Sequence, residues 1–269
     1  LRILSLGAGV QSSALALMAD EGRFGPPPDC AIFADTQWEP KEVYEQLEWV
    51  QERVSFEIHM VTEGDLRKDV LNAIGDTQVG RIGQPPFYVI NPGTDDVGGA
   101  LWRKCTTEYK ILPIQRKIRE LLGYKKRQRV KKSAQQWFGI STDEAHRMRD
   151  SRVPWIDNFS PLCENGIDRK QCEAFLIERG MPKPQKSACI GCPYHSNGAW
   201  ANMKRDRSDD WADVVDFDTK LREGKLPGVT GDAFLHRRMV PLELAVVKDY
   251  NEDQIEMPFA EECEGMCGV

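Results

Sequence analysis

Two cysteines separated by two residues, Cys189 and Cys192, are the strongest chemical signal in the chain. Two thiolates at this spacing grip one metal ion or cluster across a tight turn. A redox pair is the alternative, although no thioredoxin-like context surrounds it. A metal site needs further ligands, for which we predict Cys105 and Cys172. This set favours a [4Fe–4S] cluster, with structural zinc as the alternative.

A short run of small residues, Gly7-Ala8-Gly9, lies between a predicted strand and a predicted helix. Such a turn lets the backbone approach a phosphate, and the helix start behind it offers free N–H groups. The run is neither a Walker A loop nor a Gly-x-Gly-x-x-Gly loop, and a ligand-free turn is the alternative. The residues we predict for nucleotide binding here are Ser5, Gly7, Ala8, Gly9, Gln11, Ser12 and Ser13.

Charged and polar residues follow at two further places. Asp35 and Thr36 end the second predicted strand, where open parallel sheets bind ligands. Asp35 suits a magnesium ion or a ribose hydroxyl, unless it only caps the next helix. Arg103, Lys104 and Lys110 flank Cys105 and are expected to contact phosphate.

The elements that position these residues alternate between strand and helix. Apolar strands are predicted at 2–6, 30–34, 56–61 and 134–140, and helices at 11–19, 40–53 and 106–122. This order predicts an α/β fold, a doubly wound parallel sheet of about five strands. Residues 1–150 are expected to form the nucleotide-binding domain. Residues 151–269 are expected to form a helical portion that carries the cysteine cluster and ends in a tail, packed on the same domain.

The composition limits the class of protein. The 269 residues carry a net charge of −6 and 41% hydrophobic residues, which is typical of a soluble globular chain. No apolar run is long enough to cross a membrane, and no export signal is recognised, so we expect a cytoplasmic protein. Net acidity argues against nucleic-acid binding through bulk charge, but residues 125–132 hold six basic residues and form a local exception. A solvated connection is the alternative for that run.

Five motifs in order resemble the PP-loop ATP pyrophosphatase superfamily, and in particular the phosphoadenosine-phosphosulfate (PAPS) reductase-like family. The resemblance covers residues 3 to about 220 and implies the same α/β fold. Its motifs read Ser5-Leu-Gly7, Asp35-Thr-Gln-Trp-Glu-Pro40 with Tyr44, Lys110-Ile-Leu-Pro113-Ile114, Phe138-Gly-Ile-Ser-Thr-Asp-Glu144 with Arg147 and Arg149, and Ser187-Ala-Cys-Ile-Gly-Cys-Pro-Tyr-His195 with Trp200.

The resemblance implies ATP-dependent sulfur transfer. ATP with Mg²⁺ would adenylylate an acceptor, release pyrophosphate and leave AMP to be displaced by sulfur. The acceptor would be a nucleic acid, either tRNA or DNA, and the sulfur donor a partner such as a cysteine desulfurase. Asp35 and Cys105 would serve catalysis, and a cluster held by three cysteines would leave one iron open for sulfide.

Two other functions fit the same resemblance. A reductase of PAPS or adenylylsulfate would release sulfite through Cys263 or Cys267 in the tail and take electrons from thioredoxin. The tail matches that family's Glu-Cys-Gly motif only approximately. A zinc-stabilised nucleotide-binding module without turnover is the third reading, because Gln11 stands where the PP-loop pattern has an acidic residue.

Overall fold

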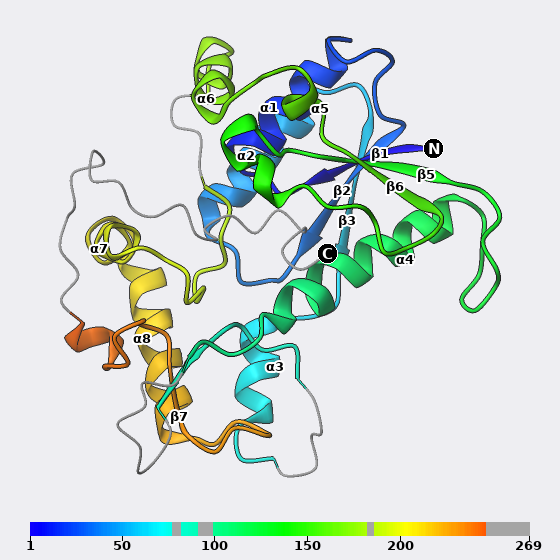
Figure 1. Cartoon of the computed structure of the whole chain (residues 1–269). Coiled ribbons are helices and arrows are strands. Elements are labelled where there is room, and N and C mark those ends of the chain that lie inside the picture. The colour runs from blue at the N-terminus through cyan, green and yellow to red at the C-terminus, as the bar shows by residue number, and fades with distance from the viewer. Residues whose placement is uncertain (77–81, 91–98, 182–185, 246–269) are drawn as a thin grey trace.

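A five-stranded parallel sheet forms the centre of the computed structural model, which describes residues 1–76, 82–90, 99–181 and 186–245 (Figure 1). Its strand order is β3-β2-β1-β5-β6, and all four pairings are parallel. The predicted α/β parallel sheet is therefore confirmed. The strands are β1 (Arg2–Leu6), β2 (Cys30–Asp35), β3 (Glu57–Thr62), β5 (Ala134–Phe138) and β6 (Ile156–Phe159).

Helices cover both faces of this sheet, as side-chain alternation along the strands requires. In β1, Leu4 and Leu6 point to one apolar cluster, and Ile3 points to the other. The first cluster is covered by α1 (Val10–Asp20), α2 (Lys41–Gln51) and α6 (Arg169–Glu178), and the second by α4 (Leu112–Leu121).

A second apolar core lies beyond the sheet. It is built around Trp38, Phe87, Trp200 and Phe217, which are all buried. The elements around it are α3 (Leu66–Ala73), α7 (Asn197–Asp206), α8 (Ser208–Glu223) and the antiparallel pair β4 (Tyr88–Ile90) and β7 (Asp232–Phe234). The predicted helices after residue 150 are thus present, and they pack against segments from the first half of the chain.

Several local features differ from the sequence prediction. β4 and β7 have three residues each, which is too short for a periodic pattern to reveal. A 3-10 turn, η2 (Thr142–Arg147), follows β5 and was not predicted. The helix expected at 106–122 begins as a π-helical turn, η1 (Thr106–Ile111), and continues into α4. Pro113 does not interrupt it, because Ile111 and Leu112 before it keep the right-handed helical conformation.

Shorter helical segments complete the described chain: α5 (Pro161–Glu164) and the 3-10 turn η3 (Leu242–Leu244). A search of the described residues finds no helix with the length and apolar character that crossing a membrane demands.

Candidate functional site

Three half-buried cysteines line one pocket beyond the carboxyl end of β2. Cys105 comes from the start of η1, and Cys189 and Cys192 come from the loop before α7. Thr36, Arg103 and Lys110 also line this pocket, together with Pro85, Pro86 and Tyr194. The structure therefore brings together three of the four predicted metal ligands and three of the predicted nucleotide-binding residues.

The loop that carries Cys189 and Cys192 is held as a tight turn. The Cys192 N–H donates to the Cys189 carbonyl at 3.1 Å, and the Ile190 N–H donates to the Trp38 carbonyl at 2.9 Å. Gly191 packs so closely on Trp38 that an added Cβ would lie 1.9 Å from the indole ring. A side chain at 191 would force the turn and the indole apart, so glycine is needed here for close approach.

A buried ion pair lies directly beside one of these thiols. Lys110 Nζ is 3.1 Å from Glu39 Oε1, and the two side chains are 7% and 1% exposed. The Cys189 Sγ donates to the same Glu39 oxygen at 3.3 Å, and the Thr36 hydroxyl donates to it at 3.1 Å. Thr36 Oγ1 is also 3.3 Å from Cys189 Sγ. Glu39 thus joins β2, η1 and the cysteine loop.

Three buried polar atoms around the pocket have no partner within the described residues. They are Glu39 Oε2, Gln84 Oε1 and Ser187 Oγ. Gln84 immediately precedes the lining residue Pro85, and Ser187 precedes Ala188, which also lines the pocket. Buried polar atoms are nearly always hydrogen-bonded, so a group of unpartnered ones marks a place where a ligand or water completes the structure.

His195 supports the cysteine loop from behind. Its Nε2 is 3.0 Å from the Cys189 carbonyl, and its ring meets the Trp200 ring edge-on at 4.6 Å. Burial lowers the pKa of His195 to about 4, so the imidazole is neutral at pH 7. A neutral ring donates to the carbonyl only if Nε2 carries the proton. His195 thereby orients the loop without adding charge to the pocket.

The two basic residues before Cys105 differ in their placement. The Arg103 guanidinium lies over the Tyr194 ring at 4.3 Å, which fixes it at the pocket wall. Lys104 is half-buried and does not line the pocket. Arg103 and Lys110 are therefore the cations in position to meet an anionic ligand there.

The side chains of the predicted phosphate loop are engaged inside the protein. Ser12 Oγ accepts from the Gly9 N–H at 3.2 Å, and Ser13 Oγ accepts from Gln46 at 2.9 Å. Gln11 donates to the Ser141 hydroxyl at 3.4 Å and accepts from Arg169 at 3.0 Å. All three side chains are fully buried, so they shape the loop from within.

The backbone of the same loop makes the expected strand-to-helix turn. Ala8 has a φ of 52°, a left-handed conformation that costs energy for a residue with a Cβ. Gly9 is the N-terminal cap of α1. Ser5 is buried within β1 and accepts from Gln136 at 3.3 Å. Within residues 5–13, Gly7 alone is partly exposed, and it is the point at which a ligand would reach the backbone.

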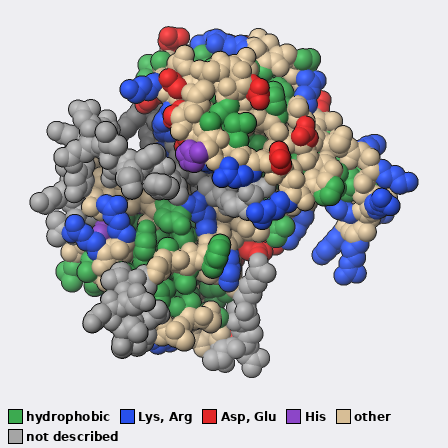
Figure 2. All heavy atoms as spheres, in the orientation of Figure 1, with side chains coloured by type: hydrophobic (Ala, Val, Ile, Leu, Met, Phe, Trp, Pro, Cys, Tyr) green, Lys and Arg blue, Asp and Glu red, His purple; other side chains and the backbone are tan. Residues whose placement is uncertain are grey.

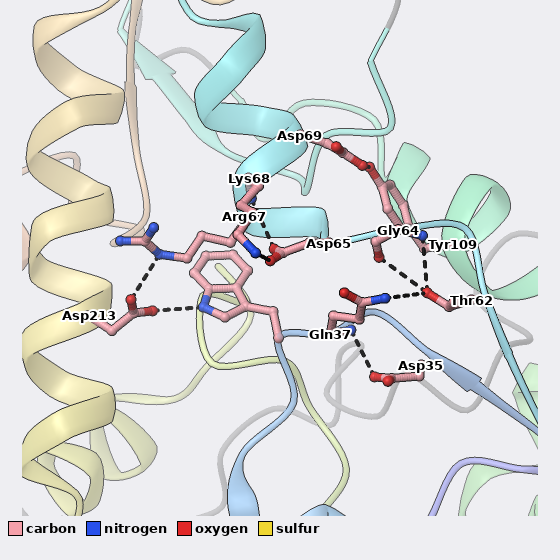
Figure 3. A network of polar contacts seen from close by, with 11 residues as sticks. Asp35, Gln37, Thr62, Gly64, Asp65, Arg67, Lys68, Asp69, Tyr109 and Asp213 are labelled. Atoms are coloured by element: carbon pink, nitrogen blue, oxygen red, sulfur yellow. Dashed lines mark hydrogen bonds and ion pairs between the residues drawn. The ribbon is translucent and has the colours of Figure 1, made fainter.

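Asp35 ends β2 at the same edge of the sheet but does not line the pocket. Its Oδ1 accepts from the Gln37 N–H at 2.8 Å (Figure 3). The same oxygen accepts from the Tyr44 hydroxyl at 2.8 Å. Burial and the Asp35 carboxylate both raise the pKa of Tyr44, so the phenol stays protonated and continues to donate. Asp35 therefore holds the β2–α2 loop in place, as a turn residue does.

The expected four-cysteine metal set does not fit this arrangement. Cys172 is buried in the core beside Phe175 and Leu176 on α6, away from the pocket that the other three thiols line. A search of the described residues for three or more His, Cys, Asp or Glu side chains placed to hold a metal ion finds none. Cys263 and Cys267 lie outside the described residues.

No family model matches the chain, and no curated protein is found to resemble it. Among solved structures, the chain is similar to phosphoadenylyl-sulfate (PAPS) reductase from Candida auris, in a crystal structure of its phosphate complex. The TM-score is 0.42 at 15% identity, and the match covers 68% of this chain and 74% of that chain. That structure is of the class of protein that the five motifs resemble.

Sequence reasoning missed the residue at the centre of the site. Glu39 lies inside the Asp35–Pro40 motif. The prediction singled out Asp35 instead, because Asp35 ends the strand. The available signal was a second carboxylate just before Pro40, at the start of a helix. Gln84 and Tyr194 carried no such signal, because their roles depend on packing between distant segments.

Proposed function

We propose that the chain is an adenine-nucleotide-dependent enzyme of sulfur chemistry, which adenylylates an acceptor and then replaces the adenylyl group with sulfur. One observation carries this proposal: Cys105, Cys189 and Cys192 line a single pocket with Lys110 and Arg103 at the ligand-binding edge of a parallel sheet. Thiols and cations together suit a reaction in which sulfur displaces a phosphate ester.

The first step would occur at the nucleotide. An oxygen of the acceptor attacks the α-phosphate of ATP, loses its proton, and expels pyrophosphate with the electron pair of the broken P–O bond. Gly7 would present backbone to the nucleotide, and the cations Arg103 and Lys110 would balance its charge. Asp35 lies at the same edge of the sheet and would hold the Mg²⁺ that accompanies ATP through Oδ2, because its Oδ1 accepts from Gln37 and Tyr44. The ion would supply charge neutralisation.

The second step would use the thiols. A persulfide on Cys189, loaded by a donor such as a cysteine desulfurase, attacks through its terminal sulfur the acceptor atom that carries the adenylylated oxygen. The bond from that atom to the oxygen breaks, and AMP leaves with the oxygen. Cys192 then attacks Cys189 Sγ, which frees the thiolated acceptor and leaves a Cys189–Cys192 disulfide. An external dithiol would reduce that disulfide. The turn around Gly191 suits this exchange because it keeps the two cysteines on one side of one loop.

The test is to follow ATP and sulfur separately. Full-length protein is incubated with ATP, Mg²⁺, a cysteine desulfurase with cysteine, and either bulk tRNA or duplex DNA. We expect pyrophosphate and AMP to be released and sulfur to appear in one acceptor. Cys189→Ser should retain pyrophosphate release but lose at least about tenfold of the sulfur transfer. Cys163→Ser, outside the pocket, is the matched control.

Two results would overturn this proposal. Sulfite release from PAPS with no pyrophosphate from ATP would assign the chain to the reductases. ATP binding with one tightly held zinc ion and no turnover would assign it to non-catalytic nucleotide-binding modules.

A further inference from the structure

A strongly basic projection stands between α4 and β5. Residues 125–132 contain four lysines and two arginines and no acidic residue. All six basic side chains are exposed. Figure 2 shows Lys and Arg side chains gathered on this projection at the right of the molecule. The residues outside it carry a net charge of −12, so the projection opposes the charge of the rest of the chain.

The cations of the projection differ from most of their counterparts elsewhere. Exposed lysines at 41, 68, 220 and 225 each pair with a nearby carboxylate. Within the part of the chain that the structure describes, none of the six cations at 125–132 forms an ion pair. Their charges are therefore left to attract an external anion.

Hydrogen bonds hold the projection in a defined conformation. Arg119 donates to the carbonyls of Lys125 and Gln128, with its Nε 3.0 Å from the first. The Lys125 N–H donates to the Gln128 side chain at 3.0 Å, and the Lys132 N–H donates to the Tyr124 hydroxyl at 3.2 Å. Arg127 has a φ of 68°, a conformation held only by such surrounding bonds. A preformed loop loses little entropy when it binds.

A second basic segment joins the projection to the site edge of the sheet. The connection from β5 to β6 begins at Ser141, which contacts Gln11 of the predicted nucleotide loop. It carries exposed Arg149 and Arg152 and returns beside the projection, where the Ala134 N–H donates to the Trp155 carbonyl at 2.9 Å. β5 has five residues, so the two edges are about 17 Å apart. Exposed Asp143 and Asp150 interrupt the basic residues along this connection, and exposed Asp157 follows it on β6.

We propose that residues 125–132, with Arg149 and Arg152, bind the phosphate backbone of a double-stranded nucleic acid. This inference rests on the proposed function, because it identifies the acceptor of that reaction as a duplex. A duplex has phosphates about 3.4 Å apart on each strand. About half a helical turn therefore spans the distance from the projection to the site edge. The binding reads backbone charge, not base sequence.

An anionic membrane is the competing partner for a basic projection. The projection has no exposed apolar side chain to enter the lipid, because its one apolar residue, Val130, is half-buried. Stable membrane attachment needs such a second signal besides charge. A flat anionic membrane would also lie against the acidic remainder of the chain and be repelled by it. A duplex is narrow and would contact only the basic segments. These features favour the nucleic acid.

The test measures binding of the full chain to a labelled duplex of about 20 base pairs, in DNA and RNA versions, between 50 and 200 mM KCl and without ATP. The test variant is Lys126→Gln/Arg129→Gln/Lys131→Gln/Lys132→Gln. The matched control, Lys41→Gln/Lys68→Gln/Lys220→Gln/Lys225→Gln, changes net charge equally. The test variant should weaken binding at least about tenfold and lower the slope of log K against log[KCl] by about 3. The control should keep the wild-type slope.

Three outcomes would overturn the inference: no duplex binding by wild type at 50 mM KCl, an equal loss in the control, or binding to vesicles with 30% phosphatidylserine but not to duplex. Because ATP is absent, these outcomes are independent of the proposed reaction. Duplex binding without pyrophosphate release would support this inference and contradict the proposed function. Pyrophosphate release without duplex binding would support the proposed function and contradict this inference.

Discussion

At the scale of single residues, the site depends on a carboxylate that the sequence did not single out. Glu39 is buried, pairs with Lys110, and accepts from Thr36 and Cys189. Thr36 and Lys110 were predicted from their positions after a strand and beside Cys105. Glu39 was not, because its burial arises only when the cysteine loop closes over the β2–α2 connection.

Glu39→Gln should destabilise the protein by about 3 kcal/mol, because it removes the charge that compensates Lys110 in a dry environment. Urea unfolding monitored by circular dichroism measures this loss. Glu45→Gln, which breaks the exposed pair with Lys41, should cost far less, because solvent screens a pair of exposed charges. Equal losses in the two variants would mean that the Glu39–Lys110 pair is solvated in the protein.

The lowered pKa of His195 makes stability depend on pH. The folded-state pKa is about 4, below the ordinary value of 6.5, so the unfolded chain binds the proton more readily. The contribution of this histidine to the free energy of unfolding is fully present above pH 6.5. It decreases by up to about 3 kcal/mol as the pH falls toward 4. Unfolding free energies of wild type and His195→Gln should therefore converge as the pH falls through that range.

The exposed His146 supplies the control for this effect. His146→Gln removes an exposed imidazole and serves as the matched variant for comparison. If wild type and His195→Gln instead stay a constant free energy apart between pH 4 and 7, the imidazole is protonated equally in the folded and unfolded states.

At the scale of elements, strand and helix periodicity predicted β1, β2, β3, β5 and the helices between them. It did not reveal β6, because Ile156–Phe159 is short and half polar at the sheet edge. Nor did it distinguish the π-helical turn η1 from an ordinary helix. That turn widens the helix between Cys105 and Lys110. Single π-helical turns of this kind are often found at functional sites.

The cysteine loop offers a prediction at this scale. Gly191→Ala should destabilise the protein by about 1–3 kcal/mol, because the new methyl group overlaps the Trp38 indole. Thermal unfolding and near-UV circular dichroism of the indole should both change. Gly198→Ala in α7, where the nearest atom is 3.8 Å away, should be neutral or stabilising. An unchanged melting temperature for Gly191→Ala would show that the loop does not pack on Trp38.

At the scale of the whole molecule, the pocket lies where the sheet meets the second apolar core. Trp38 extends from the β2–α2 connection into that core, and its indole N–H donates to Asp213 on α8 at 2.9 Å. Arg67 on α3 also pairs with Asp213 (Figure 3). These contacts between distant segments determine which cysteines meet. Sequence spacing could not decide this, and it led us to include Cys172, which lies in the other core.

The most direct test of the central claim is whether an adenine nucleotide and the three thiols share one site. Full-length reduced protein is alkylated with iodoacetamide at pH 8, with and without ATP or PAPS, and the rate at each cysteine is read by mass spectrometry. At ten times its dissociation constant, the nucleotide should slow Cys105, Cys189 and Cys192 about tenfold. Cys30, whose pKa burial raises to about 11, should react slowly at a rate that nucleotide does not change. Unchanged rates at all three pocket thiols under saturating nucleotide would contradict the claim.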